Sequence, residues 1–376
     1  MALLTVIEMG SLSGSSIEHV IILSFPGYTV VKVAHFGLLA PSLFLAFAGT
    51  AQAHEKWFYE GEHMPLRWDL YLRPIPLGFT IGVIVVFAAA ALLWRIRGGR
   101  DFVPGPEAFG ARDDRRMAFY GLAPAILGLH VAVPLLVYGV MGQLFTPNNV
   151  MPAGWSHFLG LAEAMVALSF IYGGMARPAS LLLVALWIIG AFIFTPEPML
   201  ESLHMLGFAG FFFLGGRGPV SVDRLLFPCV EPPAHYVPWA PAALRVGVGS
   251  SLAVVGFTEK LGNLPLADAF LHQFPFINFM PKLGIEMSNE LFATFAGSVE
   301  ILAGLMILFG IFPRTIILVA LFPLNLSLTI FNWKELIGHM PFYGALAFLL
   351  IWTPRDRDLW VAGLRRGPLE VDEPRA

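Results

Sequence analysis

The stretch 300–314, which reads EILAGLMILFGIFPR, decides the fold because it has a counterpart earlier in the chain. The counterpart is the stretch 163–177, EAMVALSFIYGGMAR. In each stretch a glutamate leads an apolar run, glycine follows, and an arginine stands 14 residues after the glutamate. Polar residues that recur in step within apolar sequence predict a duplicated membrane bundle with two related sites.

The repeat continues beyond the arginine. A second apolar run leads to a His–Met pair, at His204 in the first copy and at His339 in the second. Glu163 precedes the first histidine by 41 residues, and Glu300 precedes the second by 39. The two copies therefore differ only by a short insertion over this distance.

The composition requires a membrane. Apolar residues make up 57% of the chain and charged residues only 13%, with a mean hydropathy of +0.72. A soluble chain carries about 25% charged residues, so most of this surface must contact membrane lipid. The net charge of −3 gives no reason to expect nucleic-acid binding. The single cysteine, Cys229, excludes a disulfide within the chain and a Cys-x-x-Cys redox relay.

We expect an all-α polytopic transmembrane protein of about ten spans. These lie near 30–52, 75–94, 117–141, 157–175, 179–195, 201–216, 241–258, 291–312, 315–331 and 338–353. The predicted domains are a two-span extension at 1–110, four-helix repeats at 111–225 and 235–356, and a tail at 357–376. Because each repeat has an even number of spans, the two repeats are predicted to be parallel.

Lysine and arginine set the orientation. The loop 95–116 is rich in arginine and is placed in the cytoplasm, and alternation then puts Arg177, Arg245, Arg314 and Arg355 on the same side. We therefore expect a bacterial inner-membrane protein with both termini in the cytoplasm. As an alternative, cleavage after Ala53 would remove the preceding apolar segment as a signal peptide.

The second repeat carries short motifs that resemble the DoxX family. The motifs are Leu244–Arg245–Val246, Gly256–Phe257, Glu259–Lys260–Leu261, the glutamate-led run from Glu300, and the Gly/Arg turn from Gly310 to Arg314. The first repeat is a degraded copy, with His130 at the arginine position and Gln143 near the lysine position. The resemblance implies a four-helix bundle in a respiratory or redox system, with quinone and other membrane subunits as candidate partners beside lipid.

The glutamates and histidines within the spans are the candidate catalytic residues. Ionisable groups at membrane depth face the bundle interior, and Glu163 and His204 are expected at similar depths, as are Glu300 and His339. We therefore predict a Glu–His contact within each repeat. Such a pair suits proton transfer to a quinone, metal binding, or a hydrogen bond that only joins two spans.

Lys260 makes the second repeat the stronger candidate. We expect it to form an ion pair with Glu300, which would make a buried carboxylate tolerable. Because Gln143 replaces the lysine in the first repeat, Glu163 should lack such a partner. No metal site is expected, since neither repeat has the second Glu-x-x-His of a di-metal bundle. His204 and His339 are assigned to separate bundles, which disfavours a haem.

The outer segment His54–Phe58 is predicted to anchor the protein at the membrane interface through its aromatic residues. A copper-like site with His54 and His63 as ligands is an alternative.

Three functions remain open. The first is a membrane component of a redox system that meets quinone, and whether it is itself an enzyme stays undecided. The second is a scaffold or assembly subunit in which the Glu–His pairs only lock the bundles. The third is a transporter for a small solute, which paired repeats would suit.

Overall fold

The structure is a computed structural model that describes residues 3–6, 21–24, 54–61 and 64–365. By internal contacts the chain divides into two units, Met1–Ala46 and Phe47–Ala376. In the first unit, β1 (Leu3–Val6) and β2 (Ile21–Ser24) pair in antiparallel register. The expected span at 30–52, the cleavage site at Ala53, His63 and the end of the tail lie outside the described residues.

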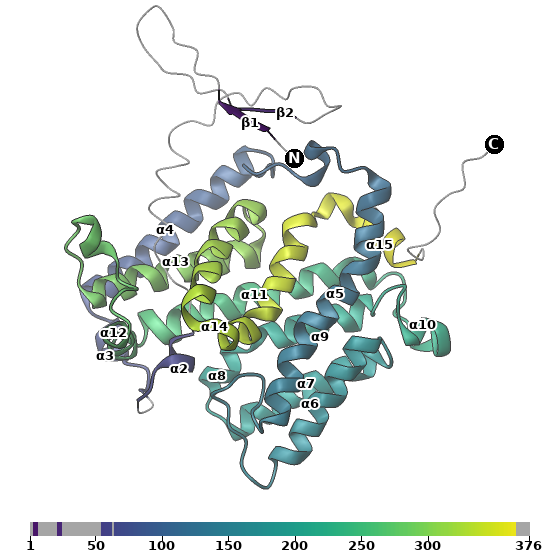
Figure 1. The fold of residues 1–376 in the computed structure, drawn as a ribbon, viewed down its shortest axis with the longest axis horizontal. Coiled ribbons are helices and arrows are strands. Elements are labelled where there is room, and N and C mark those ends of the chain that lie inside the picture. Colours follow the sequence, from purple (N-terminus) through teal and green to yellow (C-terminus); the bar gives the residue numbers. More distant parts are fainter. Residues whose placement is uncertain (1–2, 7–20, 25–53, 62–63, 366–376) are drawn as a thin grey trace, which may run out of the picture. The chain divides into compact units, whose positions relative to one another are not determined.

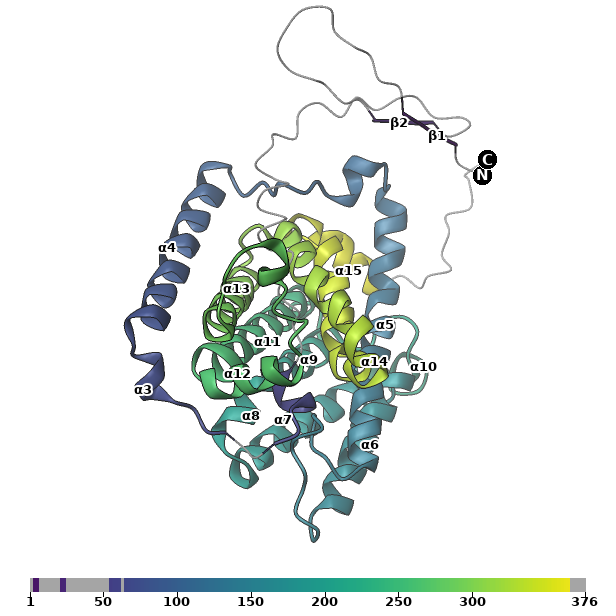
Figure 2. The same cartoon turned by 60° about the vertical axis from the view of Figure 1, so that its left-hand side comes forward.

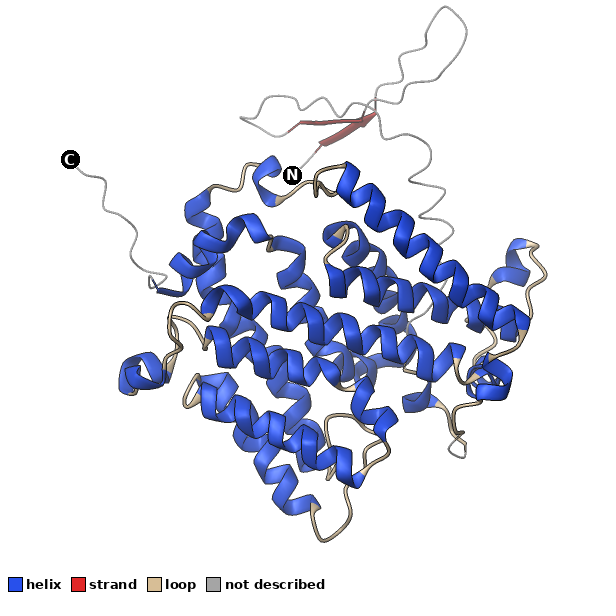
Figure 3. Ribbon diagram, turned by 180° about the vertical axis from the view of Figure 1, so that it is seen from behind, coloured by secondary structure: helices blue, strands red, loops and turns tan. Residues whose placement is uncertain are grey.

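The second unit is helical, which confirms the all-α polytopic class (Figures 1 and 3). Its apolar helices are α4 (Pro74–Ile96), α5 (Asp113–Val140), α6 (Ser156–Tyr172), α7 (Ala176–Ile193), α9 (Leu203–Gly215), α11 (Ala240–Val255), α13 (Asn289–Phe309) and α14 (Pro313–Ile351). Six segments of the described residues are long and apolar enough to cross a membrane, and α6 and α9 are shorter apolar helices. Every span expected between 75 and 353 thus coincides with a helix.

Shorter helices join or cover these elements. They are α2 (Glu55–Phe58), α3 (Trp68–Tyr71), α8 (Pro196–Glu201), α10 (Val222–Leu226), α12 (Leu264–Gln273) and α15 (Arg357–Arg365). Six short segments, η1 (Pro106–Phe109), η2 (Pro228–Val230), η3 (Val237–Trp239), η4 (Gly256–Leu261), η5 (Met280–Leu283) and η6 (Pro354–Asp356), complete the described helical elements. All are 3₁₀-helices except η4, which is a π-helix that continues α11.

The last two expected spans form the single element α14, which is broken at one residue. Asn332 has φ 63° and ψ −151°, outside the helical region. The predicted loop at 332–337 is wrong, because the backbone becomes helical again directly after Asn332. The break interrupts the helix just before Glu335 and His339.

The two copies share details that support the predicted repeat. Both α6 and α13 end at a glycine whose backbone is left-handed, with φ 68° and 67°. Residues other than glycine rarely adopt this conformation. Arg177 Nε then donates to the Phe213 carbonyl at 3.1 Å in the first copy. Arg314 Nε donates to the Leu350 carbonyl at 3.2 Å in the second. Each arginine therefore ties the third span of its copy to the end of the fourth.

Small residues let the copies pack closely together. Helix α9 of the first copy packs against α11 of the second, and α11 packs against α13 (Figure 2). At the α9–α11 crossing, a Cβ added to Gly207 would lie 2.9 Å from the Cα of Gly247. Glycine at such a crossing allows the close backbone approach that stabilises membrane helices. The N-terminal extension joins this core, since α4 packs against α13 and α2 against α12.

Candidate functional site

The segment 54–58, which contains α2, is held inside the second repeat by one carboxylate. His54 is 7% exposed, and its Nδ1 lies 3.0 Å from Oε1 of Glu259. The backbone N–H of Glu55 donates to Oε2 of the same carboxylate at 2.6 Å. Both oxygens of Glu259 are therefore engaged by a segment that lies about half the chain away in sequence.

The same segment also reaches the first repeat. Lys56 Nζ donates to Oε1 of Glu201 at 2.6 Å and forms a second ion pair with Glu197, both on α8. Thr258, on the π-helix η4, donates its hydroxyl to the same Glu201 oxygen at 2.5 Å. Segment 54–58 thus connects α8 of the first repeat with η4 of the second.

The ion pair predicted between Lys260 and Glu300 is present. Lys260 Nζ lies 3.0 Å from Glu300 Oε2 and 3.9 Å from Glu55 Oε1. Lys260 and its neighbour Glu259 are 3% and 0% exposed, so two successive residues both face the interior. The wider turn of the π-helix makes this possible, and π-helical turns occur frequently at functional sites.

His339 completes the site from α14. Its Nδ1 lies 3.1 Å from Oε1 of Glu335, one turn earlier on the same helix. The imidazole of His339 also stacks with that of His54, with 5.2 Å between ring centroids. Trp57 stacks on the other imidazole, His54, at 3.9 Å. The rings therefore form a continuous group between α2 and α14.

Together these side chains form what we name the junction cluster: His54, Glu55, Lys56, Glu201, Glu259, Lys260, Glu300, Glu335 and His339. Six polar atoms of this cluster are buried without a hydrogen-bond partner among the described residues, from Glu55, Lys260, Glu300, Glu335 and His339. Lys260 with Glu300 and His339 with Glu335 nevertheless lie within ion-pair distance. Unpaired buried polar atoms in such number indicate a site for water or a ligand.

A small cavity lies within the junction cluster. It has a volume of about 20 Å³ and is bordered by His54, Glu300 and His339 together with apolar side chains such as Phe342. That volume accommodates about one water molecule. The predicted direct contact of Glu300 with His339 is therefore replaced by a shared cavity, with each group ion-paired elsewhere.

Two carboxyls outside the spanning segments have pKa values near neutrality. Burial raises the pKa of Glu55 to about 8, against the opposing effect of the charge on Lys260. Burial also raises the pKa of Glu201 to about 7, against the effect of Lys56. Groups with a pKa close to the ambient pH are the most effective proton donors and acceptors.

The two basic neighbours behave in opposite ways. Burial lowers the pKa of His54 well below its usual value, and the charge of His339 lowers it further. Burial also lowers the pKa of Lys56, but Glu201 and other carboxylates outweigh this effect, so the net pKa is raised. We infer that Lys56 stays charged while His54 is neutral. With its Nδ1–H directed at Glu259, His54 keeps Nε2 as a proton acceptor.

The predicted contact between Glu163 and His204 is wrong. Glu163 accepts a hydrogen bond at 2.9 Å from the backbone N–H of Phe145, a residue with φ 65° in the loop after α5. His204 Nδ1 lies 3.0 Å from the hydroxyl of Ser251 on α11. The close α9–α11 packing turns His204 toward the second repeat. Glu163 instead stabilises the loop after α5, in which Phe145 has a strained backbone.

Two further expectations need correction. His204 and His339 are not kept apart in separate bundles, because both pack on Phe342, with centroid distances of 4.7 and 6.0 Å. The 54–58 segment is not mainly an interfacial anchor, since Phe58 stacks on Phe331 at 4.3 Å and Trp57 lies against α14. The candidate catalytic residues predicted from the sequence did not include Glu55, Lys56, Glu201, Glu259 and Glu335. Three consecutive ionisable residues at 54–56 and the Glu259–Lys260 pair beside an apolar span were the signals available.

The fold and the site define an integral membrane protein of the helical-bundle class with a buried group of acids and bases. Residues 240–333 match the DoxX family model. In this segment, which contains α11, η4, α12, α13 and the part of α14 before Lys334, the chain is similar to the DoxX family. No curated protein and no solved structure matches the chain.

Across 54–61 and 64–365, no group of three or more His, Cys, Asp or Glu side chains is arranged to hold a metal ion. The junction cluster is instead an alternating set of carboxyls with lysines and imidazoles, which suits proton exchange.

Proposed function

We propose that this protein is a membrane component of a redox system and that the junction cluster exchanges protons with a quinone. The single observation that carries the proposal is the group of buried acids and bases around the water-sized cavity between His54, Glu300 and His339, several of whose polar atoms lack a hydrogen bond to the described residues. Ionisable groups are costly at membrane depth and mark proton or ion pathways there. Quinone is chosen as the redox partner because the DoxX resemblance implies it.

The stoichiometry of quinone chemistry fits such a cluster. Reduction of one quinone to a quinol consumes two electrons and two protons. A reduced partner protein outside this chain would supply the electrons. Glu55 and Glu201, with pKa values of about 8 and about 7, can each release or take up a proton near neutral pH. Lys260 would stabilise the charge left on Glu300.

Access to the cluster requires movement. The cavity of about 20 Å³ takes a water molecule and not a quinone ring. Trp57 lies behind His54, one of the residues that border the cavity, since it stacks on that imidazole and lies against Gly338. The proposal therefore requires that the 54–58 segment shifts when the ring docks, so that water or the quinone oxygen meets the imidazoles.

Quinone binding tests the proposal. The purified protein in lipid nanodiscs is titrated with a short-chain quinone while tryptophan emission is recorded, in the wild type and in Trp57→Phe. We expect saturable quenching in the wild type that is strongly reduced in Trp57→Phe. Quenching that does not saturate, or that is unchanged in Trp57→Phe, would place the quinone elsewhere and overturn the proposal.

A structural junction is the second candidate, and one observation favours it. The segment 54–58 joins α8, η4 and α14, so the cluster would connect the extension to both repeats without any chemistry. Buried ion pairs are, however, poor stabilisers compared with apolar packing. A junction without chemistry would be served better by apolar side chains, and we therefore favour the proton-exchange role.

A further inference from the structure

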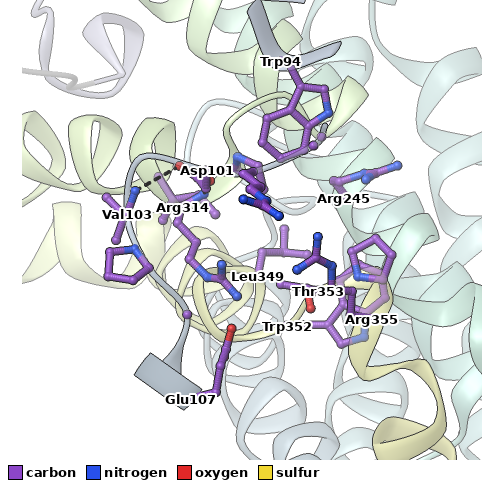
Figure 4. A pocket seen from close by; sticks show the side chains of 18 of the residues that line it. Trp94, Asp101, Val103, Glu107, Arg245, Arg314, Leu349, Trp352, Thr353 and Arg355 are labelled. Carbon is purple, nitrogen blue, oxygen red and sulfur yellow. Dashed lines mark hydrogen bonds between the residues drawn. The ribbon is translucent and has the colours of Figure 1, made fainter. Parts of the chain in front are cut away.

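A large cavity lies at the opposite, arginine-rich end of the second repeat. Its volume is about 420 Å³, and it is enclosed by the connection after α4, the ends of α13 and α14, and the start of α11 (Figure 4). Four arginines from different parts of the chain border it, namely Arg100, Arg245, Arg314 and Arg355. The positive-inside rule places this end at the cytoplasmic face.

The positive charge of this cavity is not neutralised by the part of the chain that the structure describes. Two carboxylates border it, so four arginines less two acids leave an excess of two positive charges. Asp101 is engaged by the start of α14, where it accepts hydrogen bonds from the backbone of Arg314 and Thr315 at 2.8 and 3.3 Å. Glu107 lies 3.8 Å from Arg116, and Arg116 is not part of the cavity lining. Among the described residues, none of the four arginines has a carboxylate at salt-bridge distance.

Two hydrogen-bond donors in the lining have no acceptor within the described ranges. The indole N–H of Trp352 is buried and unpartnered, and the side chain is only 8% exposed. The Nε of Arg245 is also buried without a partner. Gly310 makes room for this guanidinium, because a Cβ there would lie 2.3 Å from Nη1 of Arg245. An unpaired buried donor is costly unless a ligand completes it.

The first repeat provides a contrast. Its arginine at the corresponding end, Arg217, donates to the carbonyls of Phe170 and Ile171, the latter at 2.8 Å. That guanidinium is therefore satisfied by the chain itself. The unsatisfied donors are a property of the cavity in the second repeat.

An apolar groove continues from the cavity. It has a volume of about 530 Å³, and both spaces are bordered by Val103, Pro104 and Arg314. Leu318 and Leu350 contribute to the apolar lining of the groove. Arginines next to an apolar groove match the two parts of a phospholipid, its phosphate and its acyl chain.

We propose that this cavity binds an anionic membrane phospholipid, with its phosphate on Arg100, Arg245 and Arg355 and an acyl chain in the groove beside Leu318. The N–H of Trp352 donates to a headgroup oxygen. Basic pockets between membrane helices on the cytoplasmic side are typical sites for anionic headgroups. A free phosphate ion would share the headgroup chemistry but would leave the groove unfilled.

Native mass spectrometry of the detergent-solubilised full chain tests this site. Phosphatidylglycerol and phosphatidylcholine are added to the wild type, to Arg100→Ala/Arg355→Ala, and to Trp352→Phe. We expect phosphatidylglycerol to bind in preference to phosphatidylcholine and the double variant to bind it about 25-fold more weakly, about fivefold per arginine. Trp352→Phe keeps an aromatic side chain but removes the indole N–H together with part of the ring volume, so it should weaken binding without unfolding the protein.

The control is Arg112→Ala, because Arg112 is exposed, lies outside both spaces and pairs with Asp114. It should leave binding unchanged. Equal binding of both lipids, or equal loss in the control, would overturn the proposal. Displacement of phosphatidylglycerol by millimolar inorganic phosphate would assign the arginines to a soluble anion and would overturn the lipid assignment.

Discussion

His54 Nδ1 and Glu259 Oε1 lie 3.0 Å apart although 205 residues separate them in the chain. Both side chains are buried, at 7% and 0% exposed. This contact brings the N-terminal extension into the charged interior of the second repeat, and it is the reason why the site contains groups from both repeats and from the extension. The predictions below test the cluster that forms around it.

The pair should be energetically coupled. We expect His54→Ala and Glu259→Gln each to lower the thermal midpoint, because each leaves a buried partner unpaired, and a double-mutant cycle should give a coupling of about 1–3 kcal/mol. Thermal unfolding of the four proteins in one detergent measures it. The exposed pair Arg67–Asp69, at 2.8 Å, is the control and should show no measurable coupling. Additive effects in the His54–Glu259 cycle would show that the contact contributes nothing.

Stability should fall as the pH rises. The pKa of Glu55 is about 8 in the folded protein against 4.5 as its ordinary value, so the unfolded chain binds fewer protons between these two pH values. The thermal midpoint should therefore decrease from about pH 5 to about pH 8. Glu55→Gln should flatten this dependence. Asp69→Asn is the control, because the pKa of Asp69 is about 2 and this group stays ionised throughout the range. An unchanged slope in Glu55→Gln would contradict the assignment.

Variants of the Lys260–Glu300 pair should distinguish its effect on stability from its effect on the quinone response. Lys260→Met alone leaves Glu300 buried without its cation and should cost about 3–5 kcal/mol. Lys260→Met/Glu300→Leu removes both charges and should recover most of that loss, since apolar pairs can replace buried ion pairs. The double variant should nevertheless lose the quinone response described above. A double variant that is stable and fully responsive would remove this pair from the mechanism.

The 54–58 segment should control access to the cluster. A Cβ at position 338 would lie 2.0 Å from the ring of Trp57, so Gly338→Ala should displace that ring. Alanine is a better helix former than glycine, so α14 itself should not be weakened. We expect shifted tryptophan emission and quinone quenching at lower quinone concentration. The control is Gly78→Ala in α4, where no atom lies within 4 Å of the added Cβ. Identical quenching in Gly338→Ala and the wild type would contradict the access role.

Part of this arrangement could be predicted from the sequence. The spans followed from apolar run lengths, and the Lys260–Glu300 pair followed from their depths, since each lies near the outer end of neighbouring spans. The His54–Glu259 contact could not be predicted, because no local pattern specifies which loop a distant segment enters. The π-helix at 256–261 has no sequence signal in a single chain, yet it carries both Glu259 and Lys260 in the buried interior.

In the first repeat, the sequence predicted a contact that the structure does not contain. Similar spacing, 41 residues against 39, suggested that Glu163 and His204 form a site like that of the second repeat. Spacing along the chain sets the depth of a residue in the membrane but not its direction around the helix axis. The glycine crossing between α9 and α11 sets that direction for His204, which therefore contacts Ser251 and not Glu163.

The central claim is that the junction cluster gains and loses protons when a quinone is reduced beside it. Infrared difference spectroscopy of the protein in nanodiscs, with an added quinone reduced and reoxidised at an electrode, measures this directly. The account predicts a change in the carboxyl region on reduction that is diminished in Glu55→Gln and in Glu300→Gln and unchanged in Glu163→Gln. A spectrum with no carboxyl change, or with a change that all three variants retain, would contradict it.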